Sequence, residues 1–236
     1  MFKLMKHIVI DLTADRHRAL LSLAAIIIGM SAFGIILFSR TIIIREIPAV
    51  YSDRNPASAS ILVETADQRL QDITDQFTAI DNYEVTGSHN LRIRTTEGDK
   101  TLELFAAEDY SDKMYGRLKL LDGDFEIGKK EALIEGDAVK VAKAGIGDKV
   151  TLLLADGTAA KLQINGSVND LSVHPATMHN VVYLYVDFQT LASLDLEPNK
   201  IEFTVSGDKY DRDHILRVCD DYIVLLEQHG YQVKGL

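Results

Sequence analysis

The stretch ALLSLAAIIIGMSAFGIILF, Ala19 to Phe38, decides how this chain is organised. It holds no charged residue and no proline over its 20 residues. That is the length an α-helix needs to cross the roughly 30 Å hydrocarbon core of a bilayer. No other stretch of the 236-residue chain is apolar over such a length. We therefore expect one membrane-spanning helix near the N-terminus.

A cleaved signal peptide is the alternative interpretation of this stretch. The apolar region of a signal peptide is usually about 7–15 residues long and precedes a small-residue cleavage pattern. Residues 39–45 follow here without such a pattern, so we expect the segment to remain as an anchor. Gly29 and Gly34 are candidates for close packing against another membrane helix. Glycine is also common in membrane helices in general, so both explanations stay open.

The residues that flank the span predict its orientation. Four lysines and arginines precede it and three follow closely, an excess that favours a cytoplasmic N-terminus. Residues 1–18 form either an amphipathic leader at the cytoplasmic interface or a frayed polar end. The apolar pattern runs on to Ile47, so residues 19–47 are predicted to be a transmembrane helix and stalk that ends at Pro48. The rest of the chain then lies outside the cell (inner) membrane.

The composition of that outer part limits what it binds. From Ile47 onward there are 19 lysines and arginines against 32 aspartates and glutamates, a net charge of −13. Such an acidic surface argues against nucleic acid or anionic lipid binding by a basic patch. The single cysteine, Cys219, excludes an intrachain disulfide and lies in a helical apolar stripe, which favours a buried structural thiol.

The pattern from residue 57 onward predicts an α+β fold with an inserted lobe. Residues 57–115 have a strand–helix–strand–strand pattern, and residues 179–236 alternate strands and helices again. We expect these two parts to pair into one α+β lobe. Residues 116–178 hold short strands and tight turns, and are predicted to be a β-rich lobe inserted into it.

Several residues mark where the predicted helices begin and end. Thr65 and Gln68 have the spacing of a capping box. Asp211 or Asp213 is expected to cap the last long helix, and Gly230 to end it in a left-handed conformation.

The loop from Asp170 to Asn180 has the most enzyme-like composition. Asp170, His174 and His179 are metal-ligating residue types, but their spacing fits no strong zinc pattern, so we predict no metal. The same three residues are instead candidates for contact with a partner or cargo. The sequence lacks a nucleophile elbow, a Walker A loop and a dinucleotide-binding glycine motif, so we expect neither a catalytic site nor a cofactor.

A series of short motifs follows the span in a recognisable order. The basic leader ends with residues 16–21, and the later motifs are Leu120-Leu-Asp-Gly-Asp-Phe125, Glu131-Ala-Leu-Ile134, Ala144-Gly-Ile-Gly-Asp-Lys-Val-Thr-Leu152, Gly166-Ser-Val-Asn-Asp-Leu171, Tyr183-Leu-Tyr-Val186 and Thr190-Leu191. In this order they resemble the first half of an ABC transporter permease of the MacB/FtsX type, with a MacB-like periplasmic core domain. The order of the motifs carries the resemblance, because each one is short.

This resemblance implies a transport function without an active site in this chain. ATP hydrolysis is expected on a separate ATPase subunit, which drives extracytoplasmic movement or export of lipid, lipoprotein or peptide by mechanotransmission. The other implied partners are a second permease copy or paralogue in a dimer, membrane lipids, and a periplasmic adaptor or lipoprotein. No nucleic acid partner is implied.

Two points remain open at the level of sequence. A complete permease of this type has at least three further spans, so we expect a fragment, with a stand-alone relative as the alternative. The rival functions are a single-pass membrane-anchored binding or sensor protein with an extracytoplasmic ligand domain, and an anchored hydrolase that uses His174 or His179.

Overall fold

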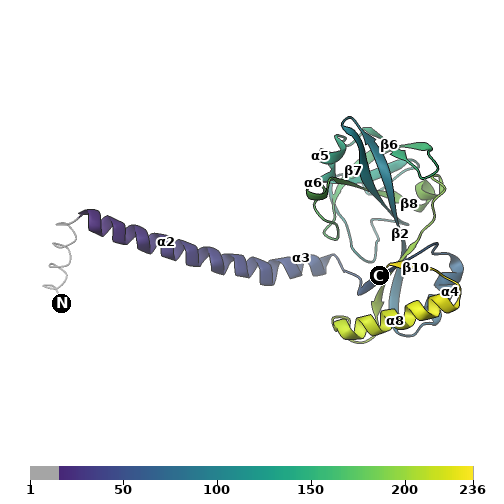
Figure 1. The fold of residues 1–236 in the computed structure, drawn as a ribbon, viewed down its shortest axis with the longest axis horizontal. Coiled ribbons are helices and arrows are strands. Elements are labelled where there is room, and N and C mark those ends of the chain that lie inside the picture. Colours follow the sequence, from purple (N-terminus) through teal and green to yellow (C-terminus); the bar gives the residue numbers. More distant parts are fainter. Residues whose placement is uncertain (1–15, 236) are drawn as a thin grey trace. The chain divides into compact units, whose positions relative to one another are not determined.

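The computed structural model describes residues 16–235 (Figure 1). It divides into two compact units, a helical segment that ends at Asp53 and a folded domain that begins at Arg54. Residues 1–15, most of the predicted leader, lie outside the described residues.

The helical segment is longer than the sequence pattern predicts. Helix α2 (Arg16–Thr41) is followed directly by a π-helical turn, η1 (Ile42–Glu46), and by helix α3 (Ile47–Asp53). Among the described residues, this is the one helix that is long and apolar enough to cross a membrane.

The predicted end of the stalk at Pro48 is wrong, because the helix continues to Asp53. A proline lacks the amide N–H and crowds the carbonyl four residues earlier. The π-helical turn includes the residue four positions before this proline, and the helix continues after it to Asp53.

The α+β lobe of the folded domain contains a four-stranded antiparallel sheet in the order β10-β1-β9-β2. Its strands are β10 (Val233–Gly235), β1 (Ala59–Val63), β9 (Lys200–Val205) and the first half of β2 (Ile80–Thr95). Helices α4 (Gln68–Gln76) and α8 (Arg212–Gln228) cover one face of this sheet (Figure 1). The buried core between them includes Ile61, Leu70, Phe203, Tyr222 and Leu226.

The ends of the two helices follow local capping chemistry. The side chain of Asp211 accepts hydrogen bonds from the amides of Asp213 and His214, as predicted, and Gly230 has a φ of 88° after the last turn of α8. At α4 the expected capping box is wrong, because Asp67 is the N-cap and accepts from the Leu70 amide at 2.9 Å. The Ala66 amide still donates to the Pro198 carbonyl at 2.7 Å, so the helix begins after it.

The second lobe is a small closed barrel. Pairings run from β2 to β3 (Gly98–Ala107), β8 (Val181–Asp187), β5 (Glu131–Glu135), β7 (Ala159–Asn169) and β6 (Lys149–Leu153), and β6 pairs again with β2. Strand β4 (Lys119–Gly123) pairs with β7 but is not one of the six strands whose pairings close the barrel. Three short helices accompany the barrel: α5 (Ala138–Ala142), α6 (Ala176–His179) and α7 (Phe188–Ala192).

The barrel interior is filled by one side of each strand. Its buried side chains include Ile93, Leu102, Leu104, Ile134, Leu152, Leu162, Ile164, Val182 and Leu184. Buried and less buried positions largely alternate in β3, β6 and β7, whereas β5 and β8 are buried on both sides. The filled interior fits a small barrel whose centre holds side chains.

Strand β2 belongs to both lobes. Residues 80–86 pair with β9, and residues 87–95 pair with β3 and, near the end, with β6. The barrel therefore takes β2, β3 and β8 from outside residues 116–178, and is larger than the insertion expected from sequence. The reason is that β3 pairs with β8, and β2 with β6, across long sequence separations, which local patterns do not reveal.

Candidate functional site

An irregular segment crosses the face of the α+β sheet that the helices leave free. We call this segment, Glu108 to Leu118, the strap; it connects β3 with β4. The helices cover the face that carries Ile201 and Phe203. Because side chains alternate along a strand, Glu202 and Thr204 point to the opposite face, where the strap contacts them.

A lysine of the strap joins two glutamates of the sheet. Glu84 of β2 and Glu202 of β9 lie directly opposite each other in the register, and like charges in such a pair destabilise a sheet. The Nζ atom of Lys113 lies 3.3 Å from Glu84 Oε2 and 2.8 Å from Glu202 Oε2. The three side chains are only 11–19% exposed, so Lys113 compensates two largely buried carboxylates.

A second lysine completes this cluster on the sheet side. Lys200 Nζ lies 2.8 Å from Glu202 Oε1. Burial raises the pKa of Glu202, but the ammonium groups of Lys113 and Lys200 outweigh burial and hold this pKa below its ordinary value of 4.5. Glu202 is therefore ionised at neutral pH, and the cluster is a chain of three ion pairs in the order Glu84, Lys113, Glu202, Lys200.

Backbone and hydroxyl groups fix the strap beside Lys113. The amides of Met114 and Tyr115 donate to Glu84, at 3.1 and 3.2 Å. The Tyr115 hydroxyl donates to the Asn82 carbonyl at 3.0 Å and lies 2.9 Å from Thr204 Oγ1. The strap is thus bound to both β2 and β9.

The strap also binds the residues that follow the helical segment in sequence. The Gly116 amide donates to the Asn55 carbonyl at 3.2 Å, and the Arg117 amide donates to the Arg54 carbonyl at 2.9 Å. In return, Asn55 Nδ2 donates to the Met114 carbonyl at 2.8 Å. Arg54 and Asn55, which we call the linker, are therefore paired with the strap by backbone and side chain.

The other end of the strap is anchored in the barrel lobe. Tyr110 is buried and meets Tyr185 of β8 edge to face, with 5.8 Å between ring centroids. Burial raises the pKa of Tyr110 well above its usual range. At the far end Leu118 is buried and continues into β4.

The strap, the linker, Glu84, Glu202 and Lys200 together form what we call the junction. It connects the linker, the α+β sheet and the barrel through one continuous segment. Sequence patterns do not point to it, because the strap has no helical or strand periodicity. The only local signal is a glutamate on the polar side of each of two strands, and their opposition depends on a long-range register.

The residues singled out from sequence lie elsewhere. A Cβ atom added at Gly29 or at Gly34 meets nothing within 4 Å in the described structure. Asp170 accepts hydrogen bonds from the Ser172 amide and hydroxyl and from the Tyr185 hydroxyl, the last at 3.0 Å, so it orders its loop. Among the described residues, no group of three or more metal-ligating side chains is close enough to hold a metal ion.

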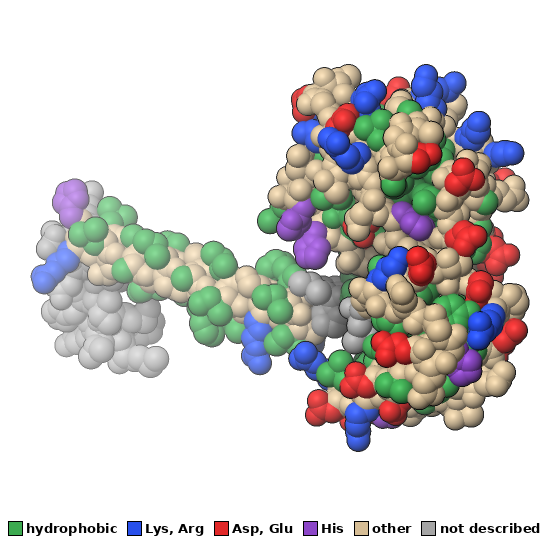
Figure 2. Space-filling view, turned by 45° about the vertical axis from the view of Figure 1, so that its right-hand side comes forward, with side chains coloured by type: hydrophobic (Ala, Val, Ile, Leu, Met, Phe, Trp, Pro, Cys, Tyr) green, Lys and Arg blue, Asp and Glu red, His purple; other side chains and the backbone are tan. Residues whose placement is uncertain are grey.

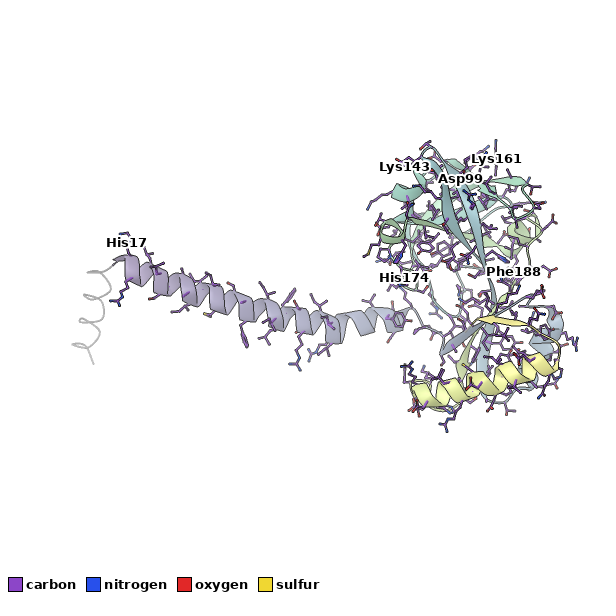
Figure 3. All side chains as sticks on the ribbon, viewed as in Figure 1. His17, Asp99, Lys143, Lys161, His174 and Phe188 are labelled. Atoms are coloured by element: carbon purple, nitrogen blue, oxygen red, sulfur yellow. The ribbon has the colours of Figure 1, made fainter. Side chains whose placement is uncertain are left out.

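The structure brings the two loop histidines together. The rings of His174 and His179 meet edge to face with 5.0 Å between centroids, and both residues are exposed. Figure 3 labels His174 on the barrel lobe. Asp170 binds Ser172 and Tyr185, and no hydrogen bond joins it to either ring in the described structure.

Comparisons with known proteins find similarity in fold and none in sequence family. No family model and no curated protein matches the sequence. Among solved structures, the extracellular domain of the noncanonic ABC-type transporter YknZ from Gram-positive bacteria is 15% identical over 75% of this chain and 100% of its own, with a TM-score of 0.45. The periplasmic region of MacB from Actinobacillus actinomycetemcomitans is 14% identical over 77% and 91%, with a TM-score of 0.43.

A third solved structure, a domain assigned to a permease protein from Porphyromonas gingivalis, is 13% identical over 75% of this chain and 84% of its own, with a TM-score of 0.40. These likenesses concern the fold of about three quarters of this chain. The described residues form one N-terminal apolar helix followed by a mixed α and β domain.

Proposed function

We propose that this chain is the first part of an ABC transporter permease of the MacB/FtsX type. Its apolar helix is the first span, with the N-terminus in the cytoplasm, and its two-lobed domain lies outside the membrane. A separate ATPase subunit hydrolyses ATP, and the domain transmits the resulting movement to a lipid, lipoprotein or peptide. The chain itself catalyses no reaction.

The junction is the observation that carries this proposal. The linker follows the last helical residue, Asp53, and is paired with the strap, which is bound to the sheet through Lys113 and to the barrel through Tyr110. A pull on the linker is therefore carried to two lobes at once by hydrogen bonds and ion pairs. A ligand-binding domain on a passive anchor has no need for such a connection.

The order of the sequence motifs supports the same proposal independently. It extends from the basic leader to Thr190-Leu191 and includes residues of β4, β5, β6, β7 and β8. The proposed partners are an ATPase subunit, a second permease copy or paralogue, membrane lipids and a periplasmic adaptor or lipoprotein.

The predicted site residues take two roles in this proposal. Gly29 and Gly34 lie in α2, where they leave the helix backbone open to close approach by another span. Asp170, His174 and His179 belong to an exposed loop of the barrel lobe, and we assign them to contact with an extracytoplasmic partner or cargo.

Affinity purification of the native protein from membranes in mild detergent tests the proposal. We expect an ATPase subunit in stoichiometric amount. Recovery of the anchored protein alone would contradict it and favour a single-pass binding or sensor protein. Replacing Gly29 and Gly34 with leucine should reduce recovery of the second permease copy, whereas the matched change Ala24→Leu in the same helix should not.

A further inference from the structure

One outer face of the barrel carries a concentration of positive charge. It lies over β2, β6 and β7, and its cations are Arg92, Arg94, Lys149 and Lys161. All four are exposed. We call these four residues, together with Thr151 and Asp99, the basic face. Figure 3 labels Asp99 and Lys161 on the barrel.

The sheet register places these side chains side by side. Arg94 pairs with Thr151, and Thr151 pairs in turn with Lys161. Paired residues in adjacent strands point to the same side. The neighbouring residues Ile93, Val150, Leu152 and Leu162 fill the barrel interior, so the cations point to solvent.

A single carboxylate organises the two arginines. Arg92 Nη2 lies 3.4 Å from Asp99 Oδ2, and Arg94 Nε lies 3.3 Å from Asp99 Oδ1. The arginine side chains remain 67% and 62% exposed, so most of their N–H donors still face water. The basic face holds four cations and one carboxylate, on a part of the chain whose net charge is −13.

Figure 2 agrees with this uneven distribution. Lysines and arginines gather on the upper part of the folded domain in that view, whereas aspartates and glutamates are frequent lower down. The overall acidity of the sequence therefore conceals a basic surface that only the barrel register brings together. Concentrating like charges on neighbouring strands lowers stability, which a partner of opposite charge would offset.

We propose that the basic face binds an acidic polypeptide outside the membrane. The arginine pair already holds a carboxylate, that of Asp99, between two guanidinium groups, which is the chemistry that an aspartate or glutamate of a partner would meet. The partner binds through side chains, because β2, β6 and β7 are all paired with neighbours here and offer no free strand edge.

Two other classes of polyanion fit the face less well. No aromatic side chain lies among its residues, so the stacking platform that single-stranded nucleic acids use is missing from it. The face lies on the convex outside of a barrel and does not enclose a phosphate group. This inference goes beyond the proposed transport function and depends on the barrel residues alone.

Binding of fluorescent poly-L-glutamate to the full chain in neutral detergent micelles tests the proposal. We expect binding that weakens as salt rises from about 50 to about 300 mM. The double variant Arg94→Gln with Lys161→Gln should weaken it about tenfold. The control, Arg212→Gln with Lys234→Gln, removes two exposed charges from the α+β lobe and should change the affinity less than about twofold.

Three results would overturn the proposal. The first is an equal loss of affinity for poly-L-glutamate in the two double variants, which would show general charge attraction without a defined site. The second is no binding of poly-L-glutamate by the unaltered chain. The third is tighter binding of inorganic polyphosphate than of poly-L-glutamate, which would assign the face to phosphate polymers. Retained affinity in Lys161→Arg would support it, because the charge is kept. Recovery of an ATPase subunit does not depend on the basic face. A failure of this binding proposal can therefore be told apart from a failure of the proposed transport function.

Discussion

The two halves of strand β2 differ in what covers their polar side: the strap covers it in the α+β lobe, and solvent covers it in the barrel. Residues 82–94 alternate, and the even-numbered side chains lie on one face throughout. In the α+β lobe this face carries Glu84, which the strap covers and Lys113 neutralises. In the barrel it carries Arg92 and Arg94, which are exposed. The same polar side of β2 therefore binds the strap in the α+β lobe and is exposed to solvent in the barrel.

The pKa values of partly buried glutamates also differ in direction between the two lobes. The pKa of Glu202 in the junction lies below its ordinary value, because the effect of two lysines exceeds that of burial. In the barrel lobe, burial raises the pKa of Glu103 and of Glu135. Burial alone thus disfavours the charged form of a carboxylate, and buried cations reverse the effect.

The largest effect should come from Lys113→Met. It leaves Glu84 and Glu202 opposite each other without the shared cation, and we expect a loss of about 3 kcal/mol in the free energy of unfolding, measured with urea. The matched change Lys161→Met on the basic face should cost under about 0.5 kcal/mol.

A triple variant separates charge from packing at the same site. Adding Glu84→Gln and Glu202→Gln to Lys113→Met should recover most of the lost stability, because both carboxylates that Lys113 compensates are then neutral. The Lys200 ammonium loses its partner Glu202, but its side chain is 22% exposed and remains in contact with water. If the triple variant were no more stable than Lys113→Met, the ion pairs would not be what holds the strap.

A smaller effect should follow from Tyr115→Phe. This removes one hydroxyl that bonds both the Asn82 carbonyl and Thr204, and should cost about 1 kcal/mol of unfolding free energy. Tyr210→Phe serves as the control, because Tyr210 is 79% exposed. Equal stability of both variants would mean that the strap is not bound through Tyr115.

The pH dependence should have opposite signs in the two lobes. A pKa that is lower in the folded than in the unfolded protein stabilises the fold above the ordinary pKa, and this is lost as pH falls. The unaltered chain should therefore be more stable than Glu202→Gln at about pH 6, and the difference should shrink as pH falls through the lowered pKa of Glu202.

Glu103→Gln is the matched variant in the barrel lobe, and it should behave in the opposite way. Because the pKa of Glu103 is raised on folding, the variant should be the more stable protein at about pH 6, and this difference should also vanish on acidification. Urea unfolding at both pH values measures the two signs. The same sign for both variants would contradict the contrast between the lobes.

The smallest effect is expected on the exposed side of β2. Arg92→Gln should change the free energy of unfolding by less than about 0.5 kcal/mol, because its ion pair with Asp99 is exposed to solvent. Thermal or urea unfolding checks this. A loss above about 2 kcal/mol would show that the basic face is part of the structural core of the barrel.

Local signals in the sequence were sufficient to predict several individual helices and strands. The apolar run from Ala19 and the cap at Asp211 predict elements that the structure confirms. They succeed because each depends on residues a few positions apart. Strand β1 and the helix at Gln68 were also predicted, although the capping residue was not.

The junction and the barrel closure could not be predicted in the same way. Both depend on long-range register: Glu84 opposite Glu202, and Arg92 opposite Leu153. The strap has no periodicity of its own, so its role follows only once the sheet that it crosses is known. Net charge was misleading for a related reason, because it sums over the whole chain and does not show that the barrel register brings four cations onto one face.

Hydrogen exchange of the full chain in detergent micelles tests most directly whether the junction fastens the linker to the domain. In the unaltered protein, the amides of Gly116 and Arg117 should exchange slowly, because they donate to the linker carbonyls. In Lys113→Met these amides should exchange much faster, while those of β7 stay protected. Unchanged protection of Gly116 and Arg117 in the variant, or equal loss across the barrel, would contradict the fastening role of Lys113.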